Sequence, residues 1–402
     1  MQIFHNPNYN FVRWRNHWVV FSLLFMVAGA VLFFTKGFDM GIDFSGGANL
    51  VLKFKDQPPL NQLRTDLPGA AIQQYGKAEE RSLLLRLPSL GREGDYAGAT
   101  VAKLNRDLNP ESAAKHDLNF LGSDRLGSLL KQADPDVKGT NVDAQRYYNA
   151  LADRVIARRS ELGIFTSMDQ VRSVEGMSSR DAQLLNDKAF LGKFNVLNQE
   201  TVGPQVGKEL QQKAIWAVVL ASIAMGIYIA LRFDLMFGVS AVANIIHDVL
   251  IALSFMLMLR LEFSLNVVAA LLTIVGYSIN DTVVMYDRVR ENKRKFKGNW
   301  NLADQLNIAM NQTLSRTILT SSTVFVVLLA LVLFGGEVIR GFAWVMMIGV
   351  ICGTYSTVTI VPAVALWWEK LTGRRNSRAM APAPARNNDV VRETTARKRK
   401  AS

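Results

Sequence analysis

The sequence predicts an α-helical membrane protein with six transmembrane helices and one soluble domain between the first helix and the second. The chain has 402 residues, of which 49% are hydrophobic and only 20% are charged. The hydrophobic residues gather in runs of about 17–25 residues, the length that a bilayer core requires of a helix. These runs cover residues 18–35, 214–231, 235–259, 263–286, 317–334 and 342–368.

The first run has an alternative interpretation as a cleaved signal peptide. Arg13 and Arg15 precede it, and residues 28–30 read Ala-Gly-Ala, which resembles a signal-peptidase site. The apolar residues continue past this site to Phe34, which favours a retained membrane anchor. The later runs are separated by short loops, so most of them are expected to be antiparallel neighbours in one bundle.

The positive charges predict the orientation of the chain. Lys and Arg residues gather before the first run, after the fourth and after the sixth, and these segments lie on one side if all six runs span. By the positive-inside rule, both termini are expected to be cytoplasmic. The expected cytoplasmic segments are an N-terminal tail at residues 1–17, a loop with an amphipathic helix at 287–316 and a disordered basic tail at 369–402.

The segment of residues 36–213 is then expected to lie outside, in the periplasm, as an α+β domain. Alternation and helical spacing of its apolar residues predict four strands and a helix, an order consistent with a ferredoxin-like β-α-β-β-α-β unit. Between about residues 91 and 190 the pattern changes to polar helices. The strands are expected at residues 48–54, 71–75, 81–87 and 195–201, and the helices at 60–67, 143–160 and 179–188.

Several other classes of site find no support in the sequence. There is no phosphate-binding loop, and the four histidines form no spaced cluster that would indicate a metal site. The net charge of +12 gathers beside the apolar runs and in the C-terminal tail, which indicates orientation rather than nucleic-acid binding. Residues 171–178 resemble half of a helix-hairpin-helix, but Ser178 replaces its second glycine, so packing or partner contact is favoured.

Asp281 is the most informative residue because it lies inside the fourth apolar run. It precedes Asp287 by six residues and is therefore about 9 Å inside the helix end. An Asp in a span costs roughly 2.5–3.5 kcal/mol on insertion scales, so it needs a partner, a proton or water. Arg316 opens the fifth run at a similar depth and could reach it. A switchable proton relay and a static ion pair are both open interpretations.

A second set of polar residues lies at membrane depth. His247 and Asp248 are near the middle of the third run, where the His could share the proton of the costly Asp. The alternative is a hydrogen-bonded polar seam between helices. Asn280 and Thr282 flank Asp281 and are expected to make its surroundings polar.

Five separated motifs give the chain a resemblance to a known family. Two of them flank the soluble domain: the entrance motif at residues 38–47 and the exit motif at residues 201–210. The others are His247-Asp248, residues 276–288 and residues 315–323. With these motifs, across about residues 36–90 and 195–370, the chain resembles the SecF branch of the SecD/SecF family of protein-export membrane subunits. The motif residues at the domain boundaries are Asp39, Gly41, Asp43, Gly46, Gly47, Val202, Gly203, Pro204 and Gly207.

The resemblance implies one half of a transporter of the resistance-nodulation-division class, whose other half is a partner chain, SecD. It further implies association with the SecYEG channel, YidC and YajC, and contact with the translocating preprotein and membrane lipids, without a nucleic-acid partner. The expected function is to use the proton-motive force to promote export across the bacterial inner membrane after the ATPase SecA has begun it.

The resemblance also implies roles for individual residues. Asp281 and Arg316 match the family's proton pathway, which includes an Asp from SecD, and His247, Asp248, Asn280 and Thr282 take a supporting role. No cofactor, metal or covalent catalysis is expected. The stretch at about 91–190 departs from the family's small outer domain and is expected to be an insertion. Two rival functions stay open: a small-molecule or lipid exporter of the same class, and a purely structural translocon subunit.

Overall fold

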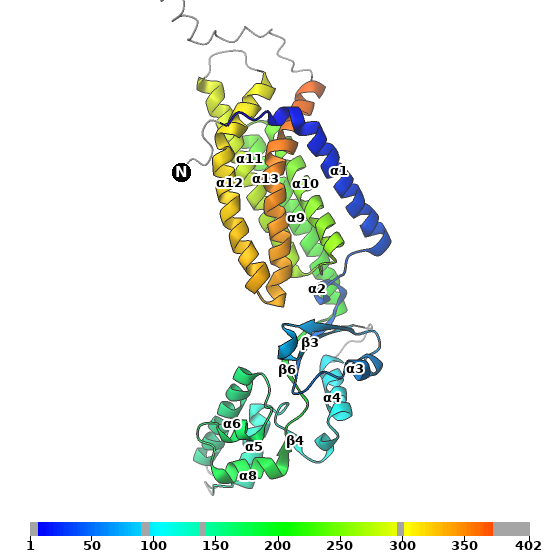
Figure 1. The fold of residues 1–402 in the computed structure, drawn as a ribbon, viewed down its shortest axis with the longest axis vertical. Coiled ribbons are helices and arrows are strands. Elements are labelled where there is room, and N and C mark those ends of the chain that lie inside the picture. The colour runs from blue at the N-terminus through cyan, green and yellow to red at the C-terminus, as the bar shows by residue number, and fades with distance from the viewer. Residues whose placement is uncertain (1–6, 90–95, 137–141, 296–300, 373–402) are drawn as a thin grey trace, which may run out of the picture.

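The computed structural model describes residues 7–89, 96–136, 142–295 and 301–372. Within these residues a bundle of long helices adjoins a separate α+β domain (Figure 1). Six helices of the described part are long and apolar enough to cross a membrane, so the predicted polytopic fold is confirmed. They are α1 (Phe11–Lys36), α9 (Pro204–Arg232), α10 (Leu235–Leu259), α11 (Leu265–Lys295), α12 (Leu302–Phe334) and α13 (Glu337–Leu371).

The helices are longer than the apolar runs that predict them. The sequence predicted a loop with its own amphipathic helix at residues 287–316, whereas α11 continues to Lys295 and α12 already begins at Leu302. The reason is that apolar residues keep helical spacing beyond the membrane run: Val289 of α11 and Leu306 of α12 are buried in the same core cluster. Residues 296–300 and the expected basic tail from residue 373 onward lie outside the described residues.

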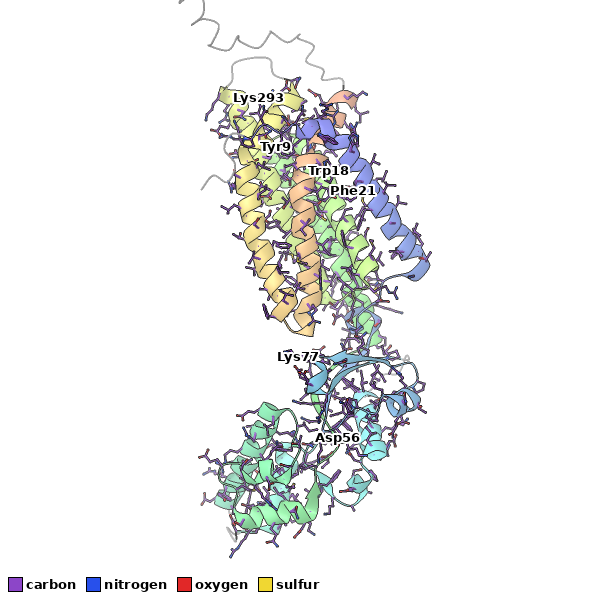
Figure 2. All side chains as sticks on the ribbon, in the orientation of Figure 1. Tyr9, Trp18, Phe21, Asp56, Lys77 and Lys293 are labelled. Carbon is purple, nitrogen blue, oxygen red and sulfur yellow. The ribbon has the colours of Figure 1, made fainter. Side chains whose placement is uncertain are left out.

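The bundle has two distinct ends, and the extramembrane domain (residues 37–203) lies at one of them. Tyr9 and Lys293 lie at the far end of the bundle, whereas Lys77 and Asp56 belong to the extramembrane domain (Figure 2). The helix α1 lies along one side of the bundle against α10 and α13. Its side chains Trp18 and Phe21 are exposed, as expected for a helix that faces lipid.

Two large apolar clusters, and a smaller one at Ile251, Ile348 and Cys352, lie in the interior of the bundle. The cluster at the far end includes Ile245 of α10, Ile279 of α11 and Val361 of α13. The cluster nearer the extramembrane domain includes Ala252 of α10 and Val350 of α13. Between these clusters each of the helices carries buried polar residues, including Asp248 of α10, Ser278 of α11 and Ser356 of α13, and they form the site described below.

The extramembrane domain is built on a four-stranded sheet with the strand order β2-β3-β1-β6, in which all neighbours are antiparallel. With helices after β1 and after β3, this is the predicted ferredoxin-like order. Alternate residues of β1 and β3, such as Leu50 and Leu85, are buried under the helices. The elements are α2 (Ile42–Ser45), β1 (Gly47–Phe54), α3 (Leu60–Asp66), β2 (Ala71–Tyr75), η1 (Ala78–Glu80), β3 (Ser82–Pro88), α4 (Tyr96–Leu108) and β6 (Phe194–Val202).

The insertion is shorter than the sequence indicated. Residues 96–108 were expected to belong to it, but they form α4, the second helix of the ferredoxin-like unit, and Val101 and Leu104 are buried in the core of the sheet. The polar composition of α4 concealed this, because only one stripe of the helix is apolar. The inserted elements that follow are η2 (Pro110–Ala113), β4 (His116–Asp117), α5 (Ser123–Ala133), α6 (Val142–Leu162), α7 (Met168–Arg172), α8 (Ser179–Lys188) and β5 (Ala189–Phe190).

The inserted elements have a core of their own and join the sheet through a few polar contacts. Leu126, Tyr148 and Phe165 are fully buried within the insertion. Lys53 Nζ of β1 donates to the carbonyl of Leu162 at 3.0 Å. At the base of the insertion, Asp117 Oδ1 accepts the backbone N–H of Gly192 at 2.8 Å and that of Asn119 at 2.9 Å.

Burial raises the pKa of Asp117 above its ordinary value of 3.8, because lost hydration outweighs the hydrogen bonds from Gly192 and Asn119 and the nearby Arg159. A carboxyl with a raised pKa in the folded state contributes stability that is present below pH 3.8 and is lost as the pH rises through the raised value. We therefore expect the free energy of local unfolding of the insertion to fall as the pH rises from 3.8 to the raised pKa of Asp117.

Native-state hydrogen exchange of the amides in α5, α6 and α8, corrected for the intrinsic rate at each pH, measures this free energy. An Asp117→Asn variant keeps an acceptor oxygen for both N–H groups and loses the charge, so its profile should be flatter. A steeper or unchanged profile in Asp117→Asn contradicts the assignment of the pH dependence to Asp117.

Candidate functional site

A hydrogen-bonded seam crosses the bundle between its two apolar clusters, and Asp248 of α10 is at its centre. The Asp248 side chain is fully buried. Its Oδ2 accepts Ser278 Oγ of α11 at 2.6 Å, Ser356 Oγ of α13 at 3.0 Å and Asn244 Nδ2 at 3.3 Å. One carboxylate therefore joins three spanning helices, because each donor has no water to bond to at this depth.

The seam continues from Asp248 toward α1. The ring of His247 lies beside Asp248, with Nδ1 2.8 Å from Oδ1. His247 Nε2 is 3.2 Å from the hydroxyl of Tyr355 on α13, which is 3.0 Å from Ser22 Oγ on α1. The predicted pairing of His247 with Asp248 thus belongs to a longer chain of polar groups that reaches the edge of the bundle.

Asp281 of α11 has different surroundings, although it lies less than one helical turn beyond Ser278. Its side chain is 4% exposed, and its Oδ2 is buried without a hydrogen-bond donor. An unpaired polar atom at this depth costs several kcal/mol relative to a satisfied one. Asp248 is therefore a satisfied carboxylate, whereas Asp281 has capacity for a proton or for a donor from outside this chain.

Arg316 does not form an ion pair with Asp281. It lies on the exposed side of α12, and the ion pairs of the described residues, taken to 4.0 Å, include none between these two side chains. Its positive charge still acts on Asp281 through space. Asn280 is exposed on the surface of α11, so it does not join the buried seam, while Thr282 is buried and donates to the Ser278 carbonyl at 3.1 Å.

The sequence reasoning missed three hydroxyl groups that extend this site. Tyr277 of α11 donates to Ser321 Oγ of α12 at 3.0 Å, and Thr354 of α13 donates to the same oxygen at 2.7 Å. Tyr277 precedes Asp281 by one helical turn and therefore lies on the same side of α11. A signal for α13 was present in the sequence, since five of the six residues 354–359 carry a hydroxyl within an otherwise apolar run.

The entrance and exit motifs meet where the bundle joins the extramembrane domain. Gly47 pairs with Val202 across β1 and β6, and Gly203 caps α9 before Pro204 begins it. Gly46 has a φ of +69°, and a Cβ on it would lie 2.8 Å from Pro204 Cα. A Cβ on Gly207 would lie 2.9 Å from the Phe44 carbonyl. The glycines therefore permit a tight turn and close contact between the two motifs.

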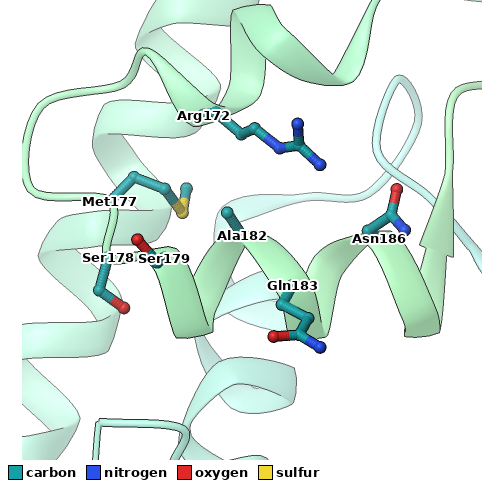
Figure 3. Close-up of a pocket in the computed structure, with 7 residues that line it drawn as sticks. All are labelled: Arg172, Met177, Ser178, Ser179, Ala182, Gln183 and Asn186. Atoms are coloured by element: carbon teal, nitrogen blue, oxygen red, sulfur yellow. The ribbon is translucent and has the colours of Figure 1, made fainter.

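The insertion contains a separate pocket at the segment that resembles a helix-hairpin-helix. Val171 and Val174 of this segment are buried in the core of the insertion. The pocket has a volume of about 410 Å³, and Arg172 extends over α8 from α7 (Figure 3). Across the described parts of the chain, no cluster of three His, Cys, Asp or Glu side chains is placed to hold a metal ion. The pocket is lined by Arg172, Met177, Ser178, Ser179, Ala182, Gln183 and Asn186.

Comparison with known proteins gives consistent matches along the chain. The family model "Protein export membrane protein SecD/SecF, C-terminal" matches residues 183–371, and "SecD/SecF GG Motif" matches residues 31–58. Protein translocase subunit SecF of Koribacter versatilis is 35% identical over 407 residues, with 97% of this chain and 99% of that protein covered. The SecF subunit of Gemmatimonas aurantiaca is 34% identical over 401 residues, with the same coverage.

Two solved structures are similar as well. The crystal structure of SecDF from Thermus, described as a translocon-associated membrane protein, matches with a TM-score of 0.62 and 29% identity. The match covers 91% of this chain and 39% of that chain. SecDF in its super-membrane-facing form matches with a TM-score of 0.55 and 29% identity, over 94% and 41% of the two chains. The present chain therefore corresponds in length to less than half of SecDF.

The contrast between the two buried carboxyls predicts different effects of substitution on stability. Asp248→Ala removes the acceptor that Ser278, Ser356 and Asn244 share. Asn244 Nδ2 keeps Ser278 Oγ and Ser356 Oγ keeps the Gly353 carbonyl as acceptors, whereas Ser278 Oγ loses its bond to Asp248, at about 1–3 kcal/mol for a group that stays unsatisfied. Asp281→Asn removes no hydrogen bond at Oδ2 and should change stability little. Thermal unfolding of the detergent-solubilised chain, followed by tryptophan fluorescence, measures both, with exposed Asp287→Asn as the control. Equal stability of the Asp248 and Asp281 variants is the result that contradicts this assignment.

Proposed function

The chain belongs to the SecD/SecF family of protein-export membrane proteins, and on this premise we propose that it couples proton entry at Asp281 to movement of its extramembrane domain. Its relatives over nearly the full length are SecF subunits of the protein translocase, so the chain is a multi-pass accessory subunit of the Sec translocase. Its partner in that complex is SecD, with which SecF forms the single SecDF chain of Thermus.

The observation that carries the proposal is the incomplete bonding of Asp281. A buried carboxyl with a donor-free oxygen is suited to take up and release a proton, because protonation removes the cost of an unpaired charge. At the neighbouring seam both carboxylate oxygens of Asp248 have hydrogen-bond partners, which supports a fixed arrangement of α10, α11 and α13. Asp281 is therefore the group that changes state, and Asp248 and His247 hold the helices around it.

The exposed face of α11 beside Asp281 supports a shared site with SecD. Thr273, Gly276 and Asn280 recur at helical spacing and are exposed in the isolated chain, and Arg316 of α12 is exposed as well. Small and polar residues at membrane depth favour contact with another helix over contact with lipid. An acidic residue of SecD on this face would pair with Arg316 and compete for it with Asp281.

The direction of the chain in the membrane follows from its charges. Close to the spans, basic residues gather at the bundle end with Lys293, whereas the short loops at the opposite end hold only Arg260 and Arg340, so by the positive-inside rule the end with Lys293 faces the cytoplasm. The extramembrane domain is then periplasmic, and both termini are cytoplasmic. The membrane is the bacterial inner membrane, where the proton-motive force drives protons from the periplasm toward the cytoplasm.

The proton-motive force supplies enough energy to shift an equilibrium between two arrangements of the helices. One elementary charge that crosses 100 mV releases about 2.3 kcal/mol, which shifts a two-state equilibrium by roughly tenfold or more. Protonation of Asp281 weakens its attraction to Arg316 and lets α11 and α12 shift. The extramembrane domain moves with them and limits the backsliding of a preprotein that emerges from the SecYEG channel. YidC and YajC are proposed as further neighbours, and no covalent step is required of the chain.

Two rival functions differ in what they predict for Asp281. A small-molecule or lipid exporter of the resistance-nodulation-division class would lose resistance to its substrates on loss of Asp281, while protein export stays normal. A purely structural translocon subunit would tolerate Asp281→Asn. The similarity to SecF subunits over 97% of the chain favours the export function over the first rival.

The proposed orientation predicts which engineered cysteines a membrane-impermeant maleimide reaches. In a Cys352→Ala background, Asp56→Cys should react in intact spheroplasts, whereas Lys293→Cys should react only after permeabilisation. The unaltered chain is the control, because its Cys352 is only 3% exposed. Reaction of Lys293→Cys before permeabilisation contradicts the orientation.

The proton coupling predicts a selective loss of export in Asp281→Asn. Inverted membrane vesicles that contain the chain with SecD should export a reporter in two components after SecA has begun the process. We expect the gradient-dependent component to disappear in Asp281→Asn and the gradient-independent component to remain. Asp287→Asn, which changes an exposed carboxyl on the same helix, should behave like the unaltered chain. Full gradient-dependent export in Asp281→Asn would falsify the assigned role.

A further inference from the structure

The helix that carries Asp281 is capped by Asp43, a residue that is far from it in the sequence. Leu265 is the first residue of α11, and its backbone N–H donates to Asp43 Oδ2 at 2.8 Å, across 222 positions of sequence. The first N–H groups of a helix have no partner within it, and a carboxylate there also interacts favourably with the helix dipole. Asp43 belongs to the entrance motif, so the extramembrane segment completes a helix of the bundle.

Backbone hydrogen bonds hold the same two segments together just before Asp43 in the chain. Phe263 N donates to the Asp39 carbonyl at 2.8 Å, and Gly41 N donates to the Phe263 carbonyl at 2.9 Å. These bonds form a short parallel bridge between Met40 and Phe263. The segment before α11 is therefore joined to the entrance motif in register, as a strand is joined in a sheet.

An apolar contact and a salt bridge extend this junction in two directions. Phe44, which is 4% exposed, packs against Ala214 of α9 and Val268 of α11, and its ring centroid lies 5.3 Å from that of Phe263. On the side of the sheet, Arg86 of β3 forms an ion pair with Glu262. The start of α11 is thus fixed to the central part of the sheet as well as to α9.

Only a short stretch of chain separates Asp43 from the sheet. The helix α2 ends at Ser45, and β1 begins at Gly47, directly after the turn at Gly46. The same turn is in close contact with Pro204 and Gly207 at the start of α9. A displacement of the first turn of α11 is therefore transmitted to β1 over four residues that are packed on all of these elements.

We propose that Asp43 is a positioning residue for coupling: by capping α11, it makes the extramembrane domain a rigid extension of the helix that carries Asp281. The proton-driven displacement that this connection transmits rests on the proposed function, whereas the capping contact itself does not. The acceptor oxygen is the essential feature, because Asn caps helices about as well as Asp does, and Ala does not. The nearby ion pair of Asp39 and Arg260, whose side chains are 43% and 51% exposed, contributes less because water screens it.

The test measures distances between spin labels in the full chain, reconstituted with SecD in liposomes. All variants carry Cys352→Ala. The distance between labels at Lys77→Cys and Leu333→Cys measures the position of the extramembrane domain relative to the bundle. The distance between labels at Lys293→Cys and Asp304→Cys measures the position of α11 relative to α12. Without a gradient, Asp43→Ala should enlarge the population with a displaced domain by roughly fivefold, the effect of losing a typical N-cap. Asp43→Asn should restore the narrow distribution, and Asp39→Ala should have the smaller effect.

An imposed proton gradient then separates the inference from the proposed function. In the unaltered chain both distances should change; in Asp43→Ala only the distance between α11 and α12 should change. An unchanged distribution in Asp43→Ala without a gradient overturns the inference, as does a broad distribution in Asp43→Asn. If the distribution broadens in Asp43→Ala but no gradient moves either pair in the unaltered chain, the capping role stands and the proton-driven function fails.

Discussion

The absence of water inside the bilayer governs this structure, and the hydrogen bonds at Asp248 are the clearest case of it. A carboxylate at that depth is tolerated only with several donors, and they come from α10, α11 and α13. The arrangement of these three helices is therefore tied to one side chain, with an apolar cluster on either side of it. Asp281 lies close by, yet its Oδ2 has no donor. The same constraint gives Asp248 several donors and leaves Asp281 with an oxygen that accepts no hydrogen bond.

The proposed role of Asp281 depends on what its helix is attached to. The far end of α11 runs into the basic segment near Lys293, and its first turn is capped by Asp43 of the entrance motif. A displacement of a helix that carries a titratable group also displaces the domain attached to its first turn, provided that the junction is rigid. The glycines at this junction contribute by their small size, because Gly46 and Gly207 allow α2 and α9 to touch backbone to backbone.

The chain also corresponds to only part of the SecDF structure that it resembles. It spans 39% of the Thermus SecDF chain, and its exposed α11 face with Arg316 has polar groups that lipid does not satisfy. The insertion adds a second unit with a core and a pocket of its own, joined to the sheet through Lys53 and the hydrogen bonds around Asp117.

Sequence and tertiary structure determined different parts of this protein. The apolar runs fixed the six spans, since a bilayer demands length and hydrophobicity, and both are local properties. Alternation likewise located the strands, and the cost of a charge in a span singled out Asp281 and Asp248. The sequence misjudged α4 and the segment at residues 287–316, because a helix with one apolar stripe looks polar in composition. Only the tertiary structure decided that Asp248 is saturated with donors, that Arg316 forms no pair with Asp281, and that Asp43 caps α11. Each of these is a contact between residues far apart in the chain, and such contacts depend on how the helices pack.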